Sequence, residues 1–290
     1  MDVIEYTDAM CSWAWGTEPK LRLLHWRFDD QIDSWRYVMG HLVEDEYLPD
    51  RDREADAPKL GEYWKVVCDQ TGMPRPDPLR RSPAGSRASG LAVKAAEQQG
   101  PATAEAVLRR MREATFVHGE PADTVDRVVS ACAGVDGLDL AALEAVVGSP
   151  EIALAYDGDR DETRTPNDYV LTLEGDRPGI GRARQAKDGR MRFVFPTILV
   201  RVGDDELTVP GWMPYEDYER ALFAAGAVPS ERTRSNPSPE EALARWPSLA
   251  GHELSVICGP DATVPSGATT LRWDGGVLHA RPGYLPAATA

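Results

Sequence analysis

The sequence predicts an α/β protein whose strand-and-helix core is interrupted by an α-helical insertion and followed by a small C-terminal appendage. Three observations support this prediction. Short apolar runs typical of strands occur near the start of the chain and again after residue 190. Between them, residues 82–153 are rich in Ala, Leu and Val at helical spacing. Residues 229–239 are rich in Ser, Pro and Arg, which is typical of a linker before the last part of the chain.

The first part of the chain contains two expected strands separated by a helix. The strands are residues 3–6 and 35–39, and both are short apolar runs. Residues 17–28 carry leucines and a phenylalanine at helical spacing, and Pro19 is tolerated in a first turn. Residues 48–63 are polar and rich in Asp, Arg and Pro, so we expect a connection there.

Four helices are expected in the central block. Their apolar residues recur every three to four positions, and Gly100-Pro101 closes the first of them. The expected ranges are 86–99, 103–117, 123–133 and 138–147. A polar, weakly patterned segment follows at 158–188.

The last third begins with a proline-containing strand. Residues 191–200 form an apolar run with Pro196 inside it, and 206–209 is a second short strand. A helix is expected at 215–225. Beyond the linker, the sequence predicts a helix at 240–246 and a hairpin at 270–280 that turns at Asp274-Gly-Gly.

These elements divide the chain into four parts. Residues 1–50 and 158–228 form the two halves of the core, 51–157 is the mainly helical insertion, and 229–290 is the linker with the C-terminal unit.

Composition excludes several function classes. The formal net charge of −15 disfavours nucleic acid or an anionic membrane as the main partner. No apolar run approaches the ~20 residues of a membrane span, and no Cys/His cluster has metal-ligand spacing. The N-terminus lacks the basic and apolar regions of a secretory signal, and four isolated cysteines are too few for a disulfide scaffold. We therefore expect a cytoplasmic protein without a metal.

Cys11 is the strongest candidate for chemistry. It lies where the first strand passes into a helix, and free N–H groups at a helix N-terminus stabilise a thiolate. This placement predicts a pKa below the ordinary thiol value, although burial by Trp13 and Trp15 would act in the opposite direction. Pro196 is unusual inside a strand, and an X-Pro bond is the one peptide bond where cis costs little. We expect the Phe195–Pro196 bond to be cis and to pack opposite Cys11.

This order of features resembles the DsbA-like branch of the thioredoxin superfamily, and within it the FrnE-like predicted disulfide oxidoreductases and isomerases. Members of that group show a D-P-M-C-S-W-C-W-G type motif, where this chain has D-A-M-C-S-W-A-W-G at residues 8–16. Their proline loop is similar to F-P-T-I-L at 195–199. The resemblance covers residues 2–226 and implies a thioredoxin-like fold with Cys11 as the catalytic residue. It also implies that Asp8, Ser12, Trp13, Ala14, Phe195, Pro196 and Thr197 shape the site or bind substrate.

Ala14 is the main departure from the motif. The second cysteine of such a motif resolves the mixed disulfide formed by the first, and Ala14 has no thiol. One-thiol chemistry remains: disulfide isomerisation, exchange with a low-molecular-weight thiol of the glutathione or mycothiol type, or addition to an electrophile. The one-cysteine motif is similar to C-P-W-A-W in proteins related to mycothiol-dependent nitroreductases. Alternatively, Ala14 is an engineered replacement of the kind used to trap intermediates.

Three functions follow from these observations. The first is a thiol oxidoreductase or isomerase that uses Cys11 and an external small thiol, with no covalently bound cofactor. The second is a thiol-dependent transferase, reductase or cis–trans isomerase acting on a small electrophile, as in the kappa-class transferases. The third is a non-catalytic binding protein that keeps the cleft. The partner is a small thiol, disulfide or electrophilic substrate in the first two, and a small molecule or a peptide in the third.

The remaining candidates are weaker. Trp13 is expected in the cleft and Trp15 in the core, while Asp8 either tunes the thiol or caps the helix. Trp212 and Met213 suit either the cleft or the core. His25 and His41 are more often surface or core residues than partners of a thiolate, and the other three cysteines are expected to be inert. Finally, we expect the helical block 82–153 to fold over the Cys11 end of the sheet and form a pocket there.

Overall fold

A four-stranded mixed sheet forms the centre of the molecule in the computed structural model, which describes residues 1–45, 48, 50–175 and 179–284. The strand order is β2-β1-β5-β6, with bounds Asp2–Thr7 for β1, Ser34–Met39 for β2, Thr197–Val202 for β5 and Asp205–Pro210 for β6. β1 runs parallel to β2 and antiparallel to β5, and β5 pairs antiparallel with β6. The parallel pair requires a crossover, which the first helix supplies.

The two faces of the sheet bury alternate residues of each strand. Val3 and Ile198 lie on the face covered by α1 (Ser12–Phe28) and α9 (Tyr215–Ala224). Ile4 and Leu199 lie on the other face, beside the proline loop. This alternation follows from the two-residue period of a strand.

α1 begins earlier than the predicted residue 17. Cys11 is its N-cap, so that Pro19 lies within the helix and not in its first turn. A sulfur that accepts from the helix backbone extends the helix back to Ser12.

The polar segment 48–63 was expected to be a connection, and this prediction is wrong. Residues Arg53–Thr71 form a long helix, α2. The Asp52 carboxylate caps it by accepting from the Ala55 N–H at 2.9 Å, and Gly72 ends it with a φ of 75°. Because α2 buries only a narrow stripe and exposes the rest, its composition is that of a loop.

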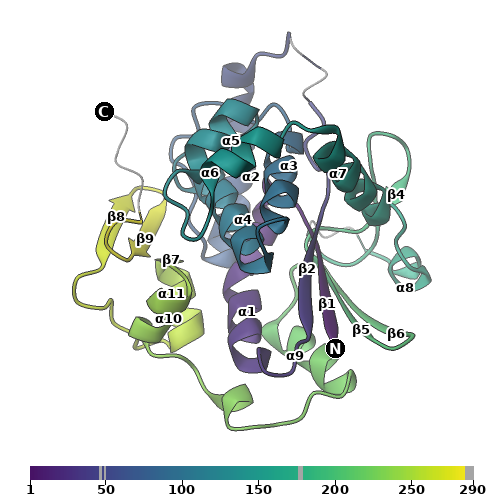
Figure 1. Ribbon diagram of the computed structural model, residues 1–290, viewed down its shortest axis with the longest axis vertical. Coiled ribbons are helices and arrows are strands. Elements are labelled where there is room, and N and C mark those ends of the chain that lie inside the picture. Colours follow the sequence, from purple (N-terminus) through teal and green to yellow (C-terminus); the bar gives the residue numbers. More distant parts are fainter. Residues whose placement is uncertain (46–47, 49, 176–178, 285–290) are drawn as a thin grey trace.

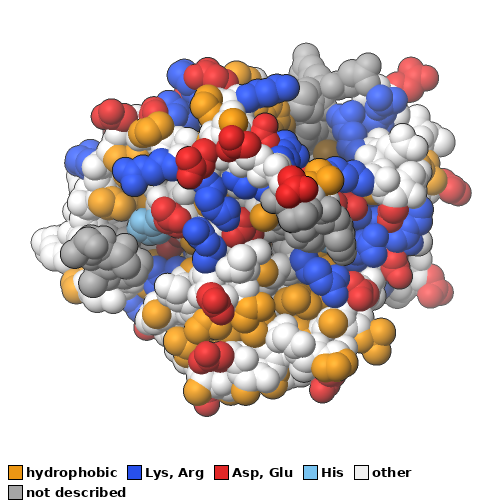
Figure 2. Space-filling view, turned by 90° about the horizontal axis from the view of Figure 1, so that it is seen from above, with side chains coloured by type: hydrophobic (Ala, Val, Ile, Leu, Met, Phe, Trp, Pro, Cys, Tyr) orange, Lys and Arg blue, Asp and Glu red, His pale blue; other side chains and the backbone are white. Residues whose placement is uncertain are grey.

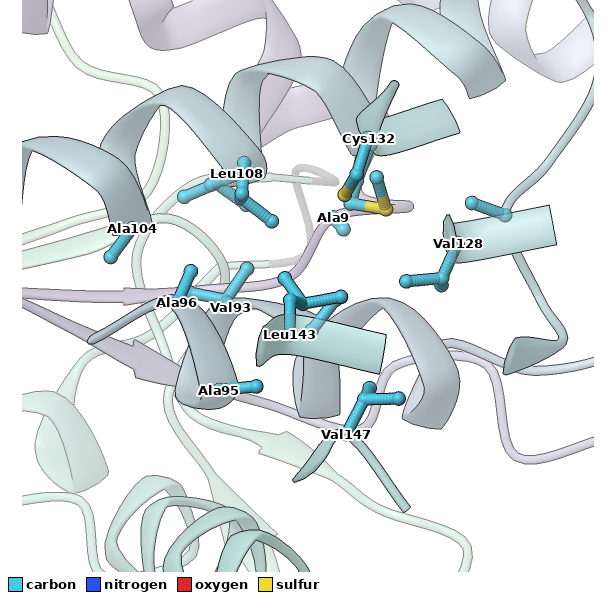
Figure 3. Close-up of a cluster of buried hydrophobic side chains, with 14 of the residues drawn as sticks. Ala9, Val93, Ala95, Ala96, Ala104, Leu108, Val128, Cys132, Leu143 and Val147 are labelled. Carbon is cyan, nitrogen blue, oxygen red and sulfur yellow. The ribbon is translucent and has the colours of Figure 1, made fainter. Parts of the chain in front are cut away.

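The four helices expected in the central block are present. They are α3 (Arg87–Glu97), α4 (Pro101–Phe116), α5 (Val125–Cys132) and α6 (Leu140–Val146). α7 (Pro150–Thr163) follows and crosses the expected boundary at residue 157, and α8 (Asp168–Thr172) lies beyond it. Acidic and basic side chains are interspersed over the face of the molecule seen in Figure 2, with apolar side chains gathered toward its lower edge. The helices of the central block share one apolar core, in which Val93, Leu108 and Leu143 are almost completely buried (Figure 3).

The strand expected at 191–200 is interrupted at the proline. Only Met191–Arg192 (β4) and Thr197–Val202 (β5) are strands, and the Phe195–Pro196 bond between them is cis. β4 pairs with β3 (Arg184–Gln185) in a separate small hairpin. A proline removes a ladder hydrogen bond, which is why the sheet begins after it.

The C-terminal unit packs against α1. Its sheet has the order β7-β9-β8, with the expected hairpin as β8 (Thr269–Trp273) and β9 (Gly276–Ala280). Its helical elements are η1 (Arg232–Arg234), α10 (Pro239–Arg245) and α11 (Gly251–Cys258), and the short strand β7 is Ser248–Ala250. The sequence predicted neither β7 nor α11. Figure 1 shows α1 between the main sheet on one side and this unit on the other.

Two further searches concern the described part of the chain. No helix there combines the length and apolar character needed to cross a membrane. No group of three or more His, Cys, Asp or Glu side chains there could hold a metal ion.

Candidate active site around Cys11

Cys11 lies between the end of β1 and the start of α1, opposite the proline loop. Its Sγ accepts the Ala14 N–H at 3.4 Å and donates to the Phe195 carbonyl oxygen at 3.4 Å. The next peptide bond, Phe195–Pro196, is cis. The predicted geometry is therefore present: a thiol at a helix N-terminus in contact with a cis-proline loop.

The prediction of a lowered pKa for Cys11 is wrong. Burial raises the pKa of this thiol to about 11, since only 4% of the residue is exposed. The Ala14 N–H acts in the opposite direction but does not offset the lost water, and the nearby Asp8 carboxylate raises the pKa further. A helix N-terminus lowers a thiol pKa only where the thiolate also keeps solvent or a close cation.

Asp8 organises the turn before the helix. One carboxylate oxygen accepts the Met10 N–H at 2.8 Å, and the other accepts the Leu42 N–H at 2.9 Å and the Ser86 hydroxyl at 2.7 Å. Asp8 therefore joins three segments of chain and does not cap α1, whose cap is Cys11. Burial raises the pKa of Asp8 above its ordinary value. These donors and the charge of His41 act in the opposite direction but do not offset the burial.

A pocket of about 480 Å³ opens beside Cys11. Cys11, Ser12 and Trp13 form one wall, and Val194 and Phe195 of the proline loop form another. The opposite side comes from α2, through the residues Leu60, Tyr63 and Trp64. A neighbouring hollow of about 560 Å³ shares Leu42, Val43, Leu60, Tyr63 and Pro83 with it.

The prediction that the helical block 82–153 forms the pocket over Cys11 is therefore wrong in one respect. The helical block packs on the sheet, but of residues 82–153 only Pro83 lines the pocket. The helix that covers Cys11 is α2, which the sequence did not predict. A signal was available, because Trp64, Val67, Cys68 and Thr71 are buried at helical spacing.

The two tryptophans of the motif occupy the predicted places. Trp13 lines the pocket, donates its Nε1–H to the Tyr63 hydroxyl at 2.9 Å and packs against Trp212 with ring centroids 5.7 Å apart. Trp15 is fully buried, donates to the Pro74 carbonyl oxygen at 2.7 Å and stacks on Phe116. Trp212 thus supports the cleft from behind.

Gly179 passes directly over the Trp13 ring. Its φ is +72°, and a Cβ there would lie 2.2 Å from a ring carbon. Glycine is needed for both reasons.

The remaining site candidates separate into lining and supporting residues. Ser12 and Phe195 line the pocket. Ala14 and Thr197 are fully buried, and the Thr197 hydroxyl donates to the Val194 carbonyl oxygen at 2.6 Å, which fixes the proline loop. The structure also adds two basic residues that the sequence did not single out, Arg184 and Arg192.

The other cysteines and the two histidines lie in other surroundings. All four thiols are free. Cys132 belongs to the core of the helical block and Cys258 packs in the C-terminal unit, while Cys68 donates to the Pro74 carbonyl oxygen at 3.7 Å. Burial raises the pKa of each, for Cys68 to about 12. His25 stacks on Trp35, and His41 packs edge-on against Tyr156.

The model of a family described as thioredoxin matches residues 5–165, which include Cys11 and the whole helical insertion. The chain belongs to the thioredoxin family. The expected fold class, a thioredoxin-like α/β core with a helical insertion, is confirmed by this match and by the observed sheet.

Solved structures with a similar fold include two bacterial thiol–disulfide oxidoreductases. The cytosolic disulfide reductase DsbM from Pseudomonas aeruginosa superposes with a TM-score of 0.54 at 15% identity, covering 77% of this chain and 99% of that one. The probable DsbA oxidoreductase SCO1869 from Streptomyces coelicolor gives 0.50 at 16% identity, covering 92% and 100%. At these identities the likeness shows the thioredoxin-like fold.

A relative with higher sequence identity carries a different description. The ClpXP adapter protein SpxH of Halalkalibacterium halodurans is 27% identical over 269 residues, which cover 89% of this chain and 78% of that protein.

Proposed function

We propose that this thioredoxin-family chain is a thiol oxidoreductase or isomerase that works through Cys11 alone. The observation that supports this proposal is the position of Sγ between the Ala14 N–H and the cis-proline loop, at the wall of a pocket large enough for a small molecule. The DsbA-like fold and the name of DsbM point in the same direction.

The proposed reaction is a thiol–disulfide exchange. Cys11 Sγ attacks one sulfur of a disulfide RS–SR, so that an Sγ–S bond forms while the S–S bond breaks. The departing RS⁻ takes the proton that Cys11 gives up. A low-molecular-weight thiol R′SH then attacks the mixed disulfide, releasing RS–SR′ and restoring the Cys11 thiol. Because Ala14 provides no second thiol, this external thiol, of the glutathione or mycothiol type, is a co-substrate and not a bound cofactor.

The raised pKa of Cys11 limits the rate of this reaction. With a pKa of about 11, roughly one Cys11 in ten thousand is ionised at pH 7. We therefore expect slow exchange with freely diffusing reagents and faster exchange with ligands that bring a positive charge or a hydrogen-bond donor to Sγ.

The test is mass spectrometry after incubation with glutathione disulfide. We expect one mixed disulfide, mapped to Cys11, that persists until free thiol is added. Cys258→Ser is the matched control and should carry the same adduct, whereas Cys11→Ser should carry none. An unmodified Cys11 in folded protein would contradict the proposal.

A second experiment restores the missing thiol. In Ala14→Cys we expect the adduct to be replaced by a disulfide between Cys11 and the introduced thiol. The lifetime of the adduct should shorten by about two orders of magnitude, because a tethered thiol acts at millimolar or higher effective concentration. Rapid loss of the adduct from the unaltered chain into an internal disulfide would refute the one-thiol mechanism.

A non-catalytic binding role is the second candidate. It is favoured by the buried neutral thiol, by Ala14, and by the description of a relative as an adapter. If it holds, Cys11→Ser keeps its ligand or protein partner with unchanged affinity, and the disulfide experiment finds no adduct. For location we keep the cytoplasm, which is supported by the word cytosolic in the name of DsbM.

A further inference from the structure

The Cys11 pocket is basic in an acidic protein. The chain has 47 acidic and 32 basic residues, so a surface hollow would ordinarily include carboxylates. Among the described residues that line this pocket, Arg184 and Arg192 are the only charged ones. The bias is therefore local to the pocket.

The two arginines face each other across a strand pair. Arg184 of β3 is the direct register partner of Arg192 of β4. Like charges directly opposite in a sheet destabilise the pair. An anion beside the Arg192 guanidinium in the pocket would offset part of this repulsion.

Arg192 is poorly compensated by the protein itself. Its guanidinium donates to the Phe193 carbonyl oxygen at 2.8 Å and lies 4.6 Å from the centre of the Phe195 ring. Within the described residues it forms no ion pair with a carboxylate. Burial lowers the pKa of this group, and the nearby Cys11, Asp8 and Glu44 act in the opposite direction without offsetting the burial.

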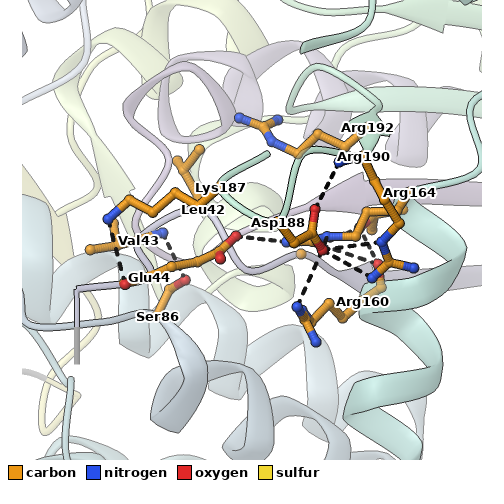
Figure 4. A network of polar contacts seen from close by, with 12 residues as sticks. Leu42, Val43, Glu44, Ser86, Arg160, Arg164, Lys187, Asp188, Arg190 and Arg192 are labelled. Atoms are coloured by element: carbon orange, nitrogen blue, oxygen red, sulfur yellow. Dashed lines mark hydrogen bonds and ion pairs between the residues drawn. The ribbon is translucent and has the colours of Figure 1, made fainter. Parts of the chain in front are cut away.

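The neighbouring arginines differ. Arg164 pairs with Glu44 at 2.7 Å and with Asp188 at 2.9 Å, and Arg190 pairs with Asp161 at 2.8 Å. Figure 4 shows these groups gathered around Asp188, while the guanidinium of Arg192 extends away from that carboxylate. Arg164 and Arg190 therefore pair with the nearby carboxylates, whereas Arg192 lines the pocket.

We propose that Arg192, with Arg184 opposite it, binds the carboxylate of a small thiol or disulfide whose sulfur reaches Cys11. The apolar part of the ligand lies against Trp13 and Tyr63. This assignment deepens the proposed function and rests on it for the sulfur chemistry, but the anion site stands on the arginines alone. Guanidinium–carboxylate pairs form two parallel hydrogen bonds, so such a ligand would be held in a fixed orientation.

The test uses three small disulfides that differ in charge: 3,3′-dithiodipropionate, bis(2-hydroxyethyl) disulfide and cystamine. Each rate of mixed-disulfide formation at Cys11 is divided by the rate of the same disulfide with a small free thiol, because the three leaving thiolates differ in pKa. These relative rates should fall in that order, with the anion at least about tenfold faster than the cation, since a hydrogen bond to a charged group contributes about 1.5–3 kcal/mol. In Arg192→Gln the three relative rates should become similar. Arg190→Gln, an exposed arginine outside the pocket, is the matched control and should keep the order. Similar relative rates for all three reagents in the unaltered chain would overturn the anion site while leaving the proposed function intact.

Binding without chemistry separates the two proposals. In Cys11→Ser, the thioether 3,3′-thiodipropionate should change the fluorescence of the pocket tryptophans and bind more tightly than 2,2′-thiodiethanol, and Arg192→Gln should remove the difference. This result is expected even if no disulfide modifies Cys11, which would refute only the exchange chemistry. Equal or undetectable binding of the two thioethers would refute the anion site.

Discussion

The N-cap of α1 and the second turn of the same helix bury ionisable groups with opposite outcomes. At its start, burial raises the pKa of Cys11 to about 11. Two turns further along, Glu18 is also buried, yet its pKa is lowered to about 2. Burial alone would raise the pKa of Glu18 as well, but the guanidinium groups of Arg109 and Arg112 outweigh it. Burial therefore does not decide the charge of a group; a counter-charge in direct contact does.

Glu18 belongs to a charge cluster, the buried ion pairs around Arg109 and Arg112, that also reaches the C-terminal unit. Arg109 of α4 bonds Glu18 of α1, Glu113 of its own helix and Glu253 of α11. Arg112 bonds Glu18 at 2.7 Å and the β1 residue Glu5 at 3.2 Å. One network thus joins the sheet, the insertion and the C-terminal unit. By contrast, the described residues that line the Cys11 pocket include no carboxylate.

The largest expected effect comes from breaking the cluster. Arg109→Met leaves three buried carboxylates without their shared partner, and we expect the free energy of unfolding to fall by about 3–5 kcal/mol. Urea unfolding measures it, with the milder Glu253→Gln as a second variant should Arg109→Met not fold. Arg220→Ala, which breaks the exposed pair with Asp217, is the control and should change it by less than about 1 kcal/mol. A similarly small loss for Arg109→Met would contradict the comparison.

The stabilisation that the charge cluster provides should decrease at low pH. In the folded chain Glu18 stays ionised down to about pH 2, whereas the unfolded chain takes up the proton near 4.5. Its stabilisation is therefore complete above pH 4.5 and is lost as the pH falls toward 2. Glu5 acts with the opposite sign, because burial raises its pKa.

We expect the free energy of unfolding to drop between pH 5 and 3, and Glu18→Gln to flatten that part of the curve. A pH dependence unchanged by Glu18→Gln would show that the carboxylate is not held ionised.

The reactivity of the Cys11 thiol should increase at high pH. Alkylation of Cys11 by iodoacetamide, followed by peptide mapping, should keep accelerating above pH 9 and level off near the pKa of about 11. In urea the same cysteine should level off near its ordinary thiol value. A plateau below pH 8 in the folded protein would restore the activated thiol that the helix N-terminus alone predicts.

The smallest effect sharpens the comparison within the site. Asp8→Asn removes the nearby negative charge that raises the pKa of Cys11, so alkylation at pH 8 should become roughly twofold to fivefold faster. Ser86→Ala removes a hydrogen bond to Asp8 but keeps the charge, and should give no acceleration. Equal rates in both variants would mean that the charge of Asp8 is screened from Sγ.

Local patterns in the sequence determined much of this protein. The strand–Cys11–helix junction, the cis bond before Pro196 and the four helices of the insertion each depend on residues within a few positions of one another, and periodicity and capping act over that range. The place of Trp13 in the cleft and of Trp15 in the core followed from the same motif.

Only the tertiary structure decided the remainder. α2 is stabilised by a narrow buried stripe and an Asp52 cap, so its helical state depends on what it packs against. The ionisation of Cys11, Glu18 and Arg192 depends on which atoms bury and surround each group, and charged neighbours lie far away in the chain: Arg192 for the thiol, Arg109 for the carboxylate, Asp8 for the guanidinium. Desolvation and Coulomb energy are sums over space, and no window of sequence contains them.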